Sequence, residues 1–209
     1  MMLTRTARFG RLFTAAGVTA LLGSCAFARP QAPAAKNRVP LPFGTDLQGR
    51  PLQRLAPAGV RAVVLYFAAT DCPVSNRYTP YIAELSERLK ARGVEILSVY
   101  PNPNDTPSAV RAHVQQYGPA GETVLDPQQS LVRLAHARLT PEAAVLVADA
   151  SGWREVYLGR IDDRYLALGR ERSTETRHDL QDALEAALAH RAVPPPGGPA
   201  VGCAIVPLP

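Results

Sequence analysis

The features that this chain of 209 residues lacks already exclude several classes of function. Its net charge is +5, but Arg5, Arg8 and Arg11 supply more than half of that excess from an N-terminal stretch without any acidic residue. Elsewhere there is no basic stripe interleaved with aromatic residues, and aromatics make up only 6% of the chain. Such a stripe is the footprint of a nucleic-acid-binding protein. We therefore expect no nucleic-acid partner.

Long hydrophobic runs, metal-binding motifs and internal repeats are also missing. The N-terminal apolar run from Leu12 to Leu22 is too short to span a membrane as a helix. The histidines do not have the spacing of metal ligands and fall in predicted helical segments, where we expect solvated positions. They are His113, His136, His178 and His190. The composition, 46% hydrophobic and 20% charged, fits one globular domain without a cofactor.

The N-terminus is typical of an export signal. Residues 1–28 combine a basic start, a short apolar stretch and a cleavage site. Two cleavage sites compete. The segment Leu22-Gly23-Ser24-Cys25 resembles a bacterial lipobox, which would leave Cys25 as a lipidated first residue and tether the protein to a membrane. The alternative, Ala26-Phe27-Ala28, would release a free protein. Both predict the bacterial periplasm or cell envelope.

The rest of the chain divides into a tether, one domain and a tail. Residues 29–38 are rich in Pro, Ala and Gln and predict an extended tether. The domain covers 39–192, and a Pro/Gly linker with a tail containing Cys203 covers 193–209. The domain opens with a predicted β-hairpin over 43–52, with Gly49 in its turn.

The central motif of the domain is a strand that ends at a cysteine. The apolar run 63–67 predicts a buried strand, and Tyr78, Ile82 and Leu85 share one face of the helix that follows. Cys72 therefore lies at a strand-to-helix turn, with Pro73 suited to the first helical position. Free amides and the helix dipole favour thiolate over thiol at such a place. We interpret Cys72 as a functional cysteine rather than a small buried apolar residue.

Strands and helices alternate through the domain, which predicts an α/β fold. After the Cys72 helix, which contains Pro80, we expect a strand at 94–100 and a helix opened by Thr106 and Pro107. A capping box at 126–129 predicts the start of another helix. A hairpin near the end of the domain makes the central sheet mixed, with helices flanking it. The remaining predicted elements are a strand at 122–125, hairpin strands at 143–147 and 153–158, a polar loop at 159–164 and a helix at 174–191. The charged residues of the loop either line the site and contact substrate or, as is more usual for such a loop, are only solvated.

This order of elements, with a cysteine after the first long strand and Thr140-Pro141 before a later hairpin, resembles the thioredoxin-like fold. More narrowly, the segments 67–73, 157–163 and 202–205 resemble the redoxin branch, which holds peroxiredoxins and exported thiol–disulfide reductases. In that family, the proline that matches Pro141 is cis and lies against the active cysteine. The backbone before it, here Thr140, hydrogen-bonds an incoming extended substrate.

Three departures from the family patterns leave the activity open. A dithiol reductase needs C-x-x-C, but the fourth position here is Ser75, which either stabilises the Cys72 thiolate or caps the helix. Peroxiredoxins carry a threonine three residues before the reactive cysteine, whereas Thr70 precedes Cys72 by two. Copper-delivering relatives use C-x-x-x-C, and Asn76 occupies the place of the second cysteine.

The missing second thiol is a role that Cys203 could fill if the tail folds back onto Cys72. In an oxidising compartment the two thiols either pair, stay reduced or hold a metal. We predict thiol–disulfide exchange with protein thiols and disulfides, in which Cys72 attacks and Cys203 resolves. The alternatives are an antioxidant thiol peroxidase acting on peroxide and a non-enzymatic module that binds copper or a client protein.

Overall fold

The strand that precedes Cys72 is the centre of the fold. In the computed structural model, which describes residues 43–150 and 152–208, it is β1 (Ala62–Phe67), and all six of its residues are buried. It pairs in parallel with β2 (Val94–Tyr100) and antiparallel with β5 (Glu142–Asp149). The central sheet is therefore mixed, as the sequence predicts.

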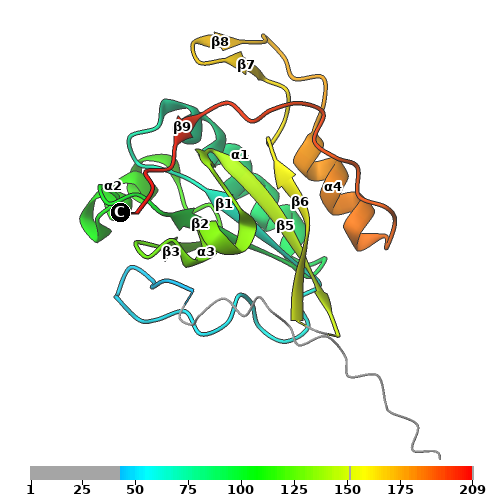
Figure 1. Ribbon diagram of the computed structural model, residues 1–209, viewed down its shortest axis with the longest axis horizontal. Helices are drawn as coiled ribbons and strands as arrows, with labels where there is room; N and C mark the ends of the chain where they lie inside the picture. Colours follow the sequence, from blue (N-terminus) through cyan, green and yellow to red (C-terminus); the bar gives the residue numbers. More distant parts are fainter. Residues whose placement is uncertain (1–42, 151, 209) are drawn as a thin grey trace, which may run out of the picture. The chain divides into compact units, whose positions relative to one another are not determined.

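Two further strands complete this sheet, whose order is β3-β2-β1-β5-β6 (Figure 1). β3 (Glu122–Leu125) extends it in parallel beside β2, and β6 (Gly152–Gly159) forms the predicted hairpin with β5. Two small pairs lie outside the main sheet. One joins β4 (Leu139–Thr140) to β9 (Cys203–Ala204), and the other joins β7 (Tyr165–Ala167) to β8 (Arg170–Glu171).

Helices cover both faces of the sheet, and alternate residues of β1 face opposite cores because side chains alternate along a strand. Val64 and Tyr66 lie in the core that receives α1 (Pro73–Lys90), α2 (Pro107–Tyr117) and α4 (Asp179–Leu188). Leu65 and Phe67 lie in the opposite core, against α3 (Ser130–Ala135). The arrangement is the thioredoxin-like fold. Among the residues described, no helix has the length and apolar character needed to cross a membrane.

The structure corrects two predicted helix boundaries, and it has isolated bridges instead of regular strands in the segment of the predicted N-terminal hairpin. α4 starts at Asp179 rather than 174. α3 starts at Ser130, because Gln129 adopts a left-handed φ of 52°, although Asp126 still caps the helix by accepting from the amides of its first three residues. The described segment 43–52 forms no regular strand, but Thr45 makes isolated bridges with Pro51 and Leu125, and the Phe43 amide donates to the Leu52 carbonyl oxygen at 2.9 Å. The predicted signal peptide, the tether and Cys25 lie outside the described residues.

The C-terminal segment packs on the domain that it follows. After α4 the chain runs back past β6 and pairs as β9 with β4 (Figure 1). Ile205, next to β9, is buried in the core that contains Phe67 and Leu131. The amide of Val206 donates to Asn102 Oδ1 at 3.0 Å. This packing brings Cys203 to the end of the sheet where β1 gives way to α1.

Candidate redox site

Cys72 is the N-cap residue of α1, with Pro73 at the first helical position and extended backbone at the cap itself (φ −91°, ψ 110°). Its side chain makes no cap hydrogen bond and is completely buried. Instead, the thiol donates to the carbonyl oxygen of Thr140, with a sulfur–oxygen distance of 2.9 Å. The turn that the sequence predicts therefore presents Cys72 to the end of β4.

The residue pair Thr140-Pro141 forms the opposite wall of this site. The peptide bond between the two residues is cis, as the family resemblance implies. Thr140 is itself fully buried, and its backbone belongs to β4. The structure thus brings Cys72 and Thr140, which are far apart in the sequence, into direct contact.

Cys203 reaches the same site through strand pairing. It lies opposite Thr140 in the antiparallel β4–β9 pair, and Thr140 Oγ1 donates to its carbonyl oxygen at 3.4 Å. Gly202 fits closely here, because a Cβ at that position would come within 2.3 Å of the Thr140 carbonyl oxygen. Both Cys72 and Cys203 are free thiols, and Cys203 is the more exposed of the two.

Hydrogen bonding gives the two sulfurs different acidities. Burial raises the pKa of Cys72, but a hydrogen bond from the Cys203 thiol, the Ser75 amide and the nearby Ser75 hydroxyl together outweigh it and hold that pKa below its ordinary value. Burial raises the pKa of Cys203, as do its hydrogen bond to Cys72 and the nearby Asp71 carboxylate. Cys72 therefore ionises first while Cys203 keeps its proton.

Ser75 lies in the first turn of α1, directly below Cys72 in the helix, and is fully buried. It does not cap α1, because Cys72 occupies the N-cap position. Its carbonyl oxygen accepts hydrogen bonds from the hydroxyls of Tyr66 at 2.9 Å and Thr79 at 3.0 Å. Its own hydroxyl oxygen has no hydrogen-bond partner of normal geometry among the described residues. This hydroxyl is therefore free to stabilise a Cys72 thiolate.

The hydroxyl of Thr70 points to another partner. Thr70 Oγ1 donates to Asp105 Oδ1 at 2.8 Å, and its amide donates to the same oxygen at 2.9 Å. Asp105 also accepts from the amide of Asn102 at 3.3 Å, which fixes the loop after β2. Thr70 thus anchors the turn that carries Cys72.

The prediction of a solvated His113 is wrong. His113 is buried, with its Nδ1 3.1 Å from the Tyr100 hydroxyl and its Nε2 2.8 Å from Asn76 Oδ1. Burial lowers the pKa of His113, so the ring is neutral. Asn76 in turn donates its amide to the Cys72 carbonyl at 3.0 Å. The imidazole therefore ties α2 to the first turn of α1, and an apolar helix face crossing this position was the available signal.

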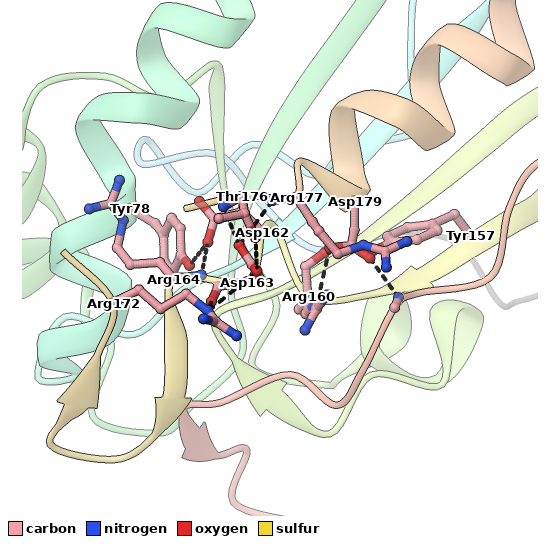
Figure 2. A network of polar contacts seen from close by, with 11 residues as sticks. Tyr78, Tyr157, Arg160, Asp162, Asp163, Arg164, Arg172, Thr176, Arg177 and Asp179 are labelled. Carbon is pink, nitrogen blue, oxygen red and sulfur yellow. Dashed lines mark hydrogen bonds and ion pairs between the residues drawn. The ribbon is translucent and has the colours of Figure 1, made fainter. Parts of the chain in front are cut away.

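Of the two alternatives for the loop at 159–164, solvation is wrong for Asp162 and Asp163, because both are buried and lie within a network of polar contacts (Figure 2). Asp162 accepts hydrogen bonds from the Tyr78 hydroxyl and, at 2.8 Å, from the Arg164 amide. Asp163 accepts from the amide and the hydroxyl of Thr176, each at 2.7 Å. Although burial acts in the other direction, these bonds and one from Arg177 lower the pKa of Asp163.

Arg160 completes this charged network. Its Nε lies 2.9 Å from Asp179 Oδ2, and the two side chains are only 13% and 5% exposed (Figure 2). We use the name charged network for Arg160, Asp162, Asp163, Asp179 and the groups that bind them. The network does not gather metal ligands, since the described part of the chain holds no group of three or more His, Cys, Asp or Glu side chains arranged for a metal ion.

The family of the chain follows from comparison with known proteins. The family model named Redoxin matches residues 31–158, which is more than half of the chain. The protein therefore belongs to the redoxin family, within the thioredoxin-like superfamily. The matched residues include Cys72, Thr140 and Pro141, whereas Cys203 lies beyond them.

Individual relatives agree with this assignment. The chain is 32% identical over 88 residues to proteins named thiol-disulfide oxidoreductase ResA from Bacillus thuringiensis (strain Al Hakam) and Bacillus anthracis. That match covers 42% of this chain and 49% of each relative, so it spans about half of their length.

Two solved structures share the fold over a larger part of the chain. An uncharacterized conserved protein from Geobacillus kaustophilus has a TM-score of 0.69 at 22% identity, covering 83% of this chain and 92% of its own. A hypothetical protein from Sinorhizobium meliloti 1021 has a TM-score of 0.65 at 24% identity, covering 77% and 87%. At these identities the likeness establishes the fold.

Proposed function

We propose that the protein catalyses thiol–disulfide exchange, with Cys72 as the attacking thiolate and Cys203 as the resolving thiol. The observation that carries this proposal is the β4–β9 pairing, which sets Cys203 opposite Thr140, the residue whose carbonyl oxygen lies 2.9 Å from the Cys72 sulfur. The opposite pKa shifts of the two thiols match the two roles, because the thiolate is the nucleophile.

The reaction balances with one partner disulfide as the oxidant. The Cys72 thiolate attacks one sulfur of that disulfide and forms a mixed disulfide, while the other partner sulfur leaves as a thiolate. Cys203 then loses its proton and attacks the Cys72 sulfur, which releases the second partner sulfur. The partner gains two electrons and two protons overall, and the protein is left with a Cys72–Cys203 disulfide. An external dithiol must reduce that bond for turnover.

Three further residues have supporting roles in this proposal. The Ser75 hydroxyl stabilises the Cys72 thiolate, because it is buried beside Cys72 without another partner of normal geometry. Thr140 and Pro141 form the wall against which the partner disulfide docks. The Thr140 carbonyl also holds Cys72 in place while it is a thiol.

The proposal places the protein outside the cytoplasm, in the periplasm or cell envelope, with Cys25 as the site of lipidation. Support comes from the basic start, the apolar stretch and the lipobox-like segment 22–25. Metabolic labelling with a fatty acid in the native host tests the anchor. The label should attach to a chain that starts at Cys25 and should be absent from a Cys25→Ala variant. Secretion of an unlabelled chain that starts after Ala28 would contradict the anchor.

The decisive experiment for the activity is intact-mass spectrometry of the reduced protein, treated with an oxidised dithiol and then alkylated. We expect a Cys72–Cys203 disulfide in the wild-type protein. The Cys203→Ser variant should instead accumulate a mixed disulfide at Cys72, and Cys72→Ser should be inert.

Two other results would redirect the assignment. Faster oxidation of Cys72 by peroxide than by the disulfide would indicate a thiol peroxidase, although the Thr70 hydroxyl is bound to Asp105. Stoichiometric copper(I) binding without exchange activity, lost in Cys72→Ser, would indicate a binding module. The same holds for stable, exchange-independent association with a client protein.

A further inference from the structure

The tail that carries Cys203 is fastened to the charged network before it reaches β9. Between the end of α4 and β9, the amide of Gly197 donates to Asp179 Oδ1 at 2.5 Å. Asp179 is the first residue of α4, and its other oxygen binds Arg160 at 2.9 Å. Figure 2 shows the tail passing next to this pair. One buried carboxylate thus holds both a loop cation and the tail backbone.

The close fit between the tail and Arg160 favours glycine at positions 197 and 198. A Cβ added to Gly197 would lie 2.8 Å from a guanidinium nitrogen of Arg160 and 2.8 Å from Asp179 Oδ1, and one added to Gly198 would lie 2.8 Å from the other guanidinium nitrogen. Just before these two glycines, Pro196 packs closely on Gly159. A Cβ added to Gly159 would lie 2.7 Å from the Cβ of Pro196. The backbone at 197–198 therefore packs closely on the guanidinium group.

The backbone of Arg160 is itself held in place by Tyr157. Its carbonyl oxygen accepts a hydrogen bond from the Tyr157 hydroxyl at 2.5 Å, and its side chain is 13% exposed. A buried charge pair of this kind is costly to break, because removing one partner leaves the other charge unpaired in the protein interior. The segment 157–163, which resembles uncharacterised redoxins, thus has a structural role: it supplies Arg160 to a buried ion pair.

We propose that Arg160 and Asp179 are positioning residues that fasten the tail at Gly197 and thereby raise the effective concentration of Cys203 at Cys72. This inference rests on the proposed function. The fastening point lies about six residues before Cys203, whereas the last residue hydrogen-bonded to the end of α4, Arg191, lies about twice as far away.

Chain length gives the scale of the effect. The effective concentration at the end of a flexible linker falls roughly as the −3/2 power of its length, so doubling the free chain lowers it about threefold. Loss of the fastening point should therefore lower the equilibrium constant for forming the Cys72–Cys203 disulfide by at least about threefold.

The test compares three variants of the full chain. Gly197→Ala pushes the tail off Arg160 and Asp179→Asn removes the ion pair. Asp182→Asn is the matched control, since Asp182 shares the first turn of α4 and is exposed. The first measurement is hydrogen exchange of the reduced protein at the amides of Ile205 and Val206, which bind Arg138 and Asn102. The second is the equilibrium constant of the Cys72–Cys203 disulfide in a thiol buffer.

We expect faster exchange at both tail amides and an equilibrium constant lowered at least about threefold in Gly197→Ala and Asp179→Asn, with neither change in Asp182→Asn. Unchanged exchange would overturn the fastening, whether or not the wild-type protein forms the disulfide. Faster exchange with an unchanged equilibrium constant would overturn the positioning role. A wild-type protein that forms no Cys72–Cys203 disulfide would instead refute the proposed function, while hydrogen exchange still decides the fastening.

Discussion

Two regions of this molecule hold the C-terminal tail, and they do so by different means. At the sulfur site, formed by Cys72, Thr140 and Cys203, the contacts are one short strand pair and hydrogen bonds to sulfur. At the charged network, Gly197 is held by a buried carboxylate that is also bound to a guanidinium group.

The difference separates chemistry from anchoring. Hydrogen bonds to a thiol are weak and are easily remade when the sulfur changes its partner, which exchange requires. Buried ion pairs with several hydrogen bonds are costly to break and hold one geometry. A tail that is anchored on both sides of Cys203, at Gly197 and at Ile205, can return the same thiol to the same place after each exchange of sulfur partners.

The largest expected effect is on stability, and it comes from disrupting the charged network at Asp163 rather than at Asp179, the residue that binds the tail at Gly197. Asp163→Ala removes the acceptor for two hydrogen bonds from Thr176 and one from the Arg177 amide. Bonds to a charged group contribute about 1.5–3 kcal/mol, so we expect the free energy of unfolding to fall by about 2 kcal/mol. Chemical denaturation of the reduced protein measures this change.

The contribution of Asp163 to the free energy of unfolding should depend on pH in a defined direction. Because the pKa of Asp163 is lowered in the folded state, its contribution to stability is present above its ordinary pKa of about 3.9 and is lost as the pH falls further. Glu84→Ala is the control, since its ion pair with Arg88 is exposed and should matter by less than about 0.5 kcal/mol. Slower disulfide exchange in Asp163→Ala, at equal folded fraction, would contradict the separation of chemistry from anchoring.

The second prediction concerns a substitution that disrupts the sulfur site. In Gly202→Ala, the new methyl group would come within 2.3 Å of the Thr140 carbonyl oxygen and 2.9 Å of the Pro141 nitrogen, so β9 must move away. Overpacking of this kind costs at least about 1 kcal/mol, and a tenfold loss corresponds to about 1.4 kcal/mol. We expect a roughly tenfold lower equilibrium constant for the Cys72–Cys203 disulfide, measured in a thiol buffer.

The control for this variant is Ala204→Ser, which changes an exposed residue of the same strand and should leave the equilibrium constant unchanged. The unfolding midpoint of reduced Gly202→Ala should move little, because the tail can detach locally while the core stays folded. A large drop in stability without loss of the disulfide would mean that β9 serves the fold rather than the sulfur chemistry.

The smallest expected effect concerns the thiolate itself. Cys203→Ala removes the hydrogen bond that stabilises the Cys72 thiolate, so the pKa of Cys72 should rise and its alkylation by iodoacetamide at pH 7 should slow severalfold. Cys203→Ser keeps a donor and should retain the wild-type profile. The measurement is the pH dependence of alkylation at Cys72. Identical midpoints in Cys203→Ala and Cys203→Ser would rule out the hydrogen bond as the cause.

The sequence was sufficient for the parts of the fold that local patterns encode. The run before Cys72, the helix after it and the β5–β6 hairpin each carry their own periodicity and turn residues, and all three are confirmed. The short pairs β4–β9 and β7–β8 could not be predicted, because two or three residues carry no periodicity.

The candidate site was predictable only in part, for a physical reason. Cys72 was marked by its own turn, and Thr140-Pro141 by family resemblance. The burial of Asp162, Asp163 and His113 could not be predicted in this way, because a charged or polar residue is usually solvated unless distant partners form hydrogen bonds with it. Those partners lie up to 84 residues away, and no local pattern connects them. For the two aspartates, the apolar residues Tyr157, Leu158 and Ile161 next to the charges were an available hint.

The pairing of β9 with β4 also fixes when the site can exist during protein synthesis. Cys72 and its helix leave the ribosome early, whereas Cys203 follows every other element of the described fold. Until translation has passed residue 203, the β1–α1 turn carries Cys72 without the strand that brings its proposed resolving thiol. Interrupted chains that meet a small disulfide such as oxidised glutathione should therefore keep the mixed disulfide formed when Cys72 attacks it, whereas completed chains should resolve it through Cys203.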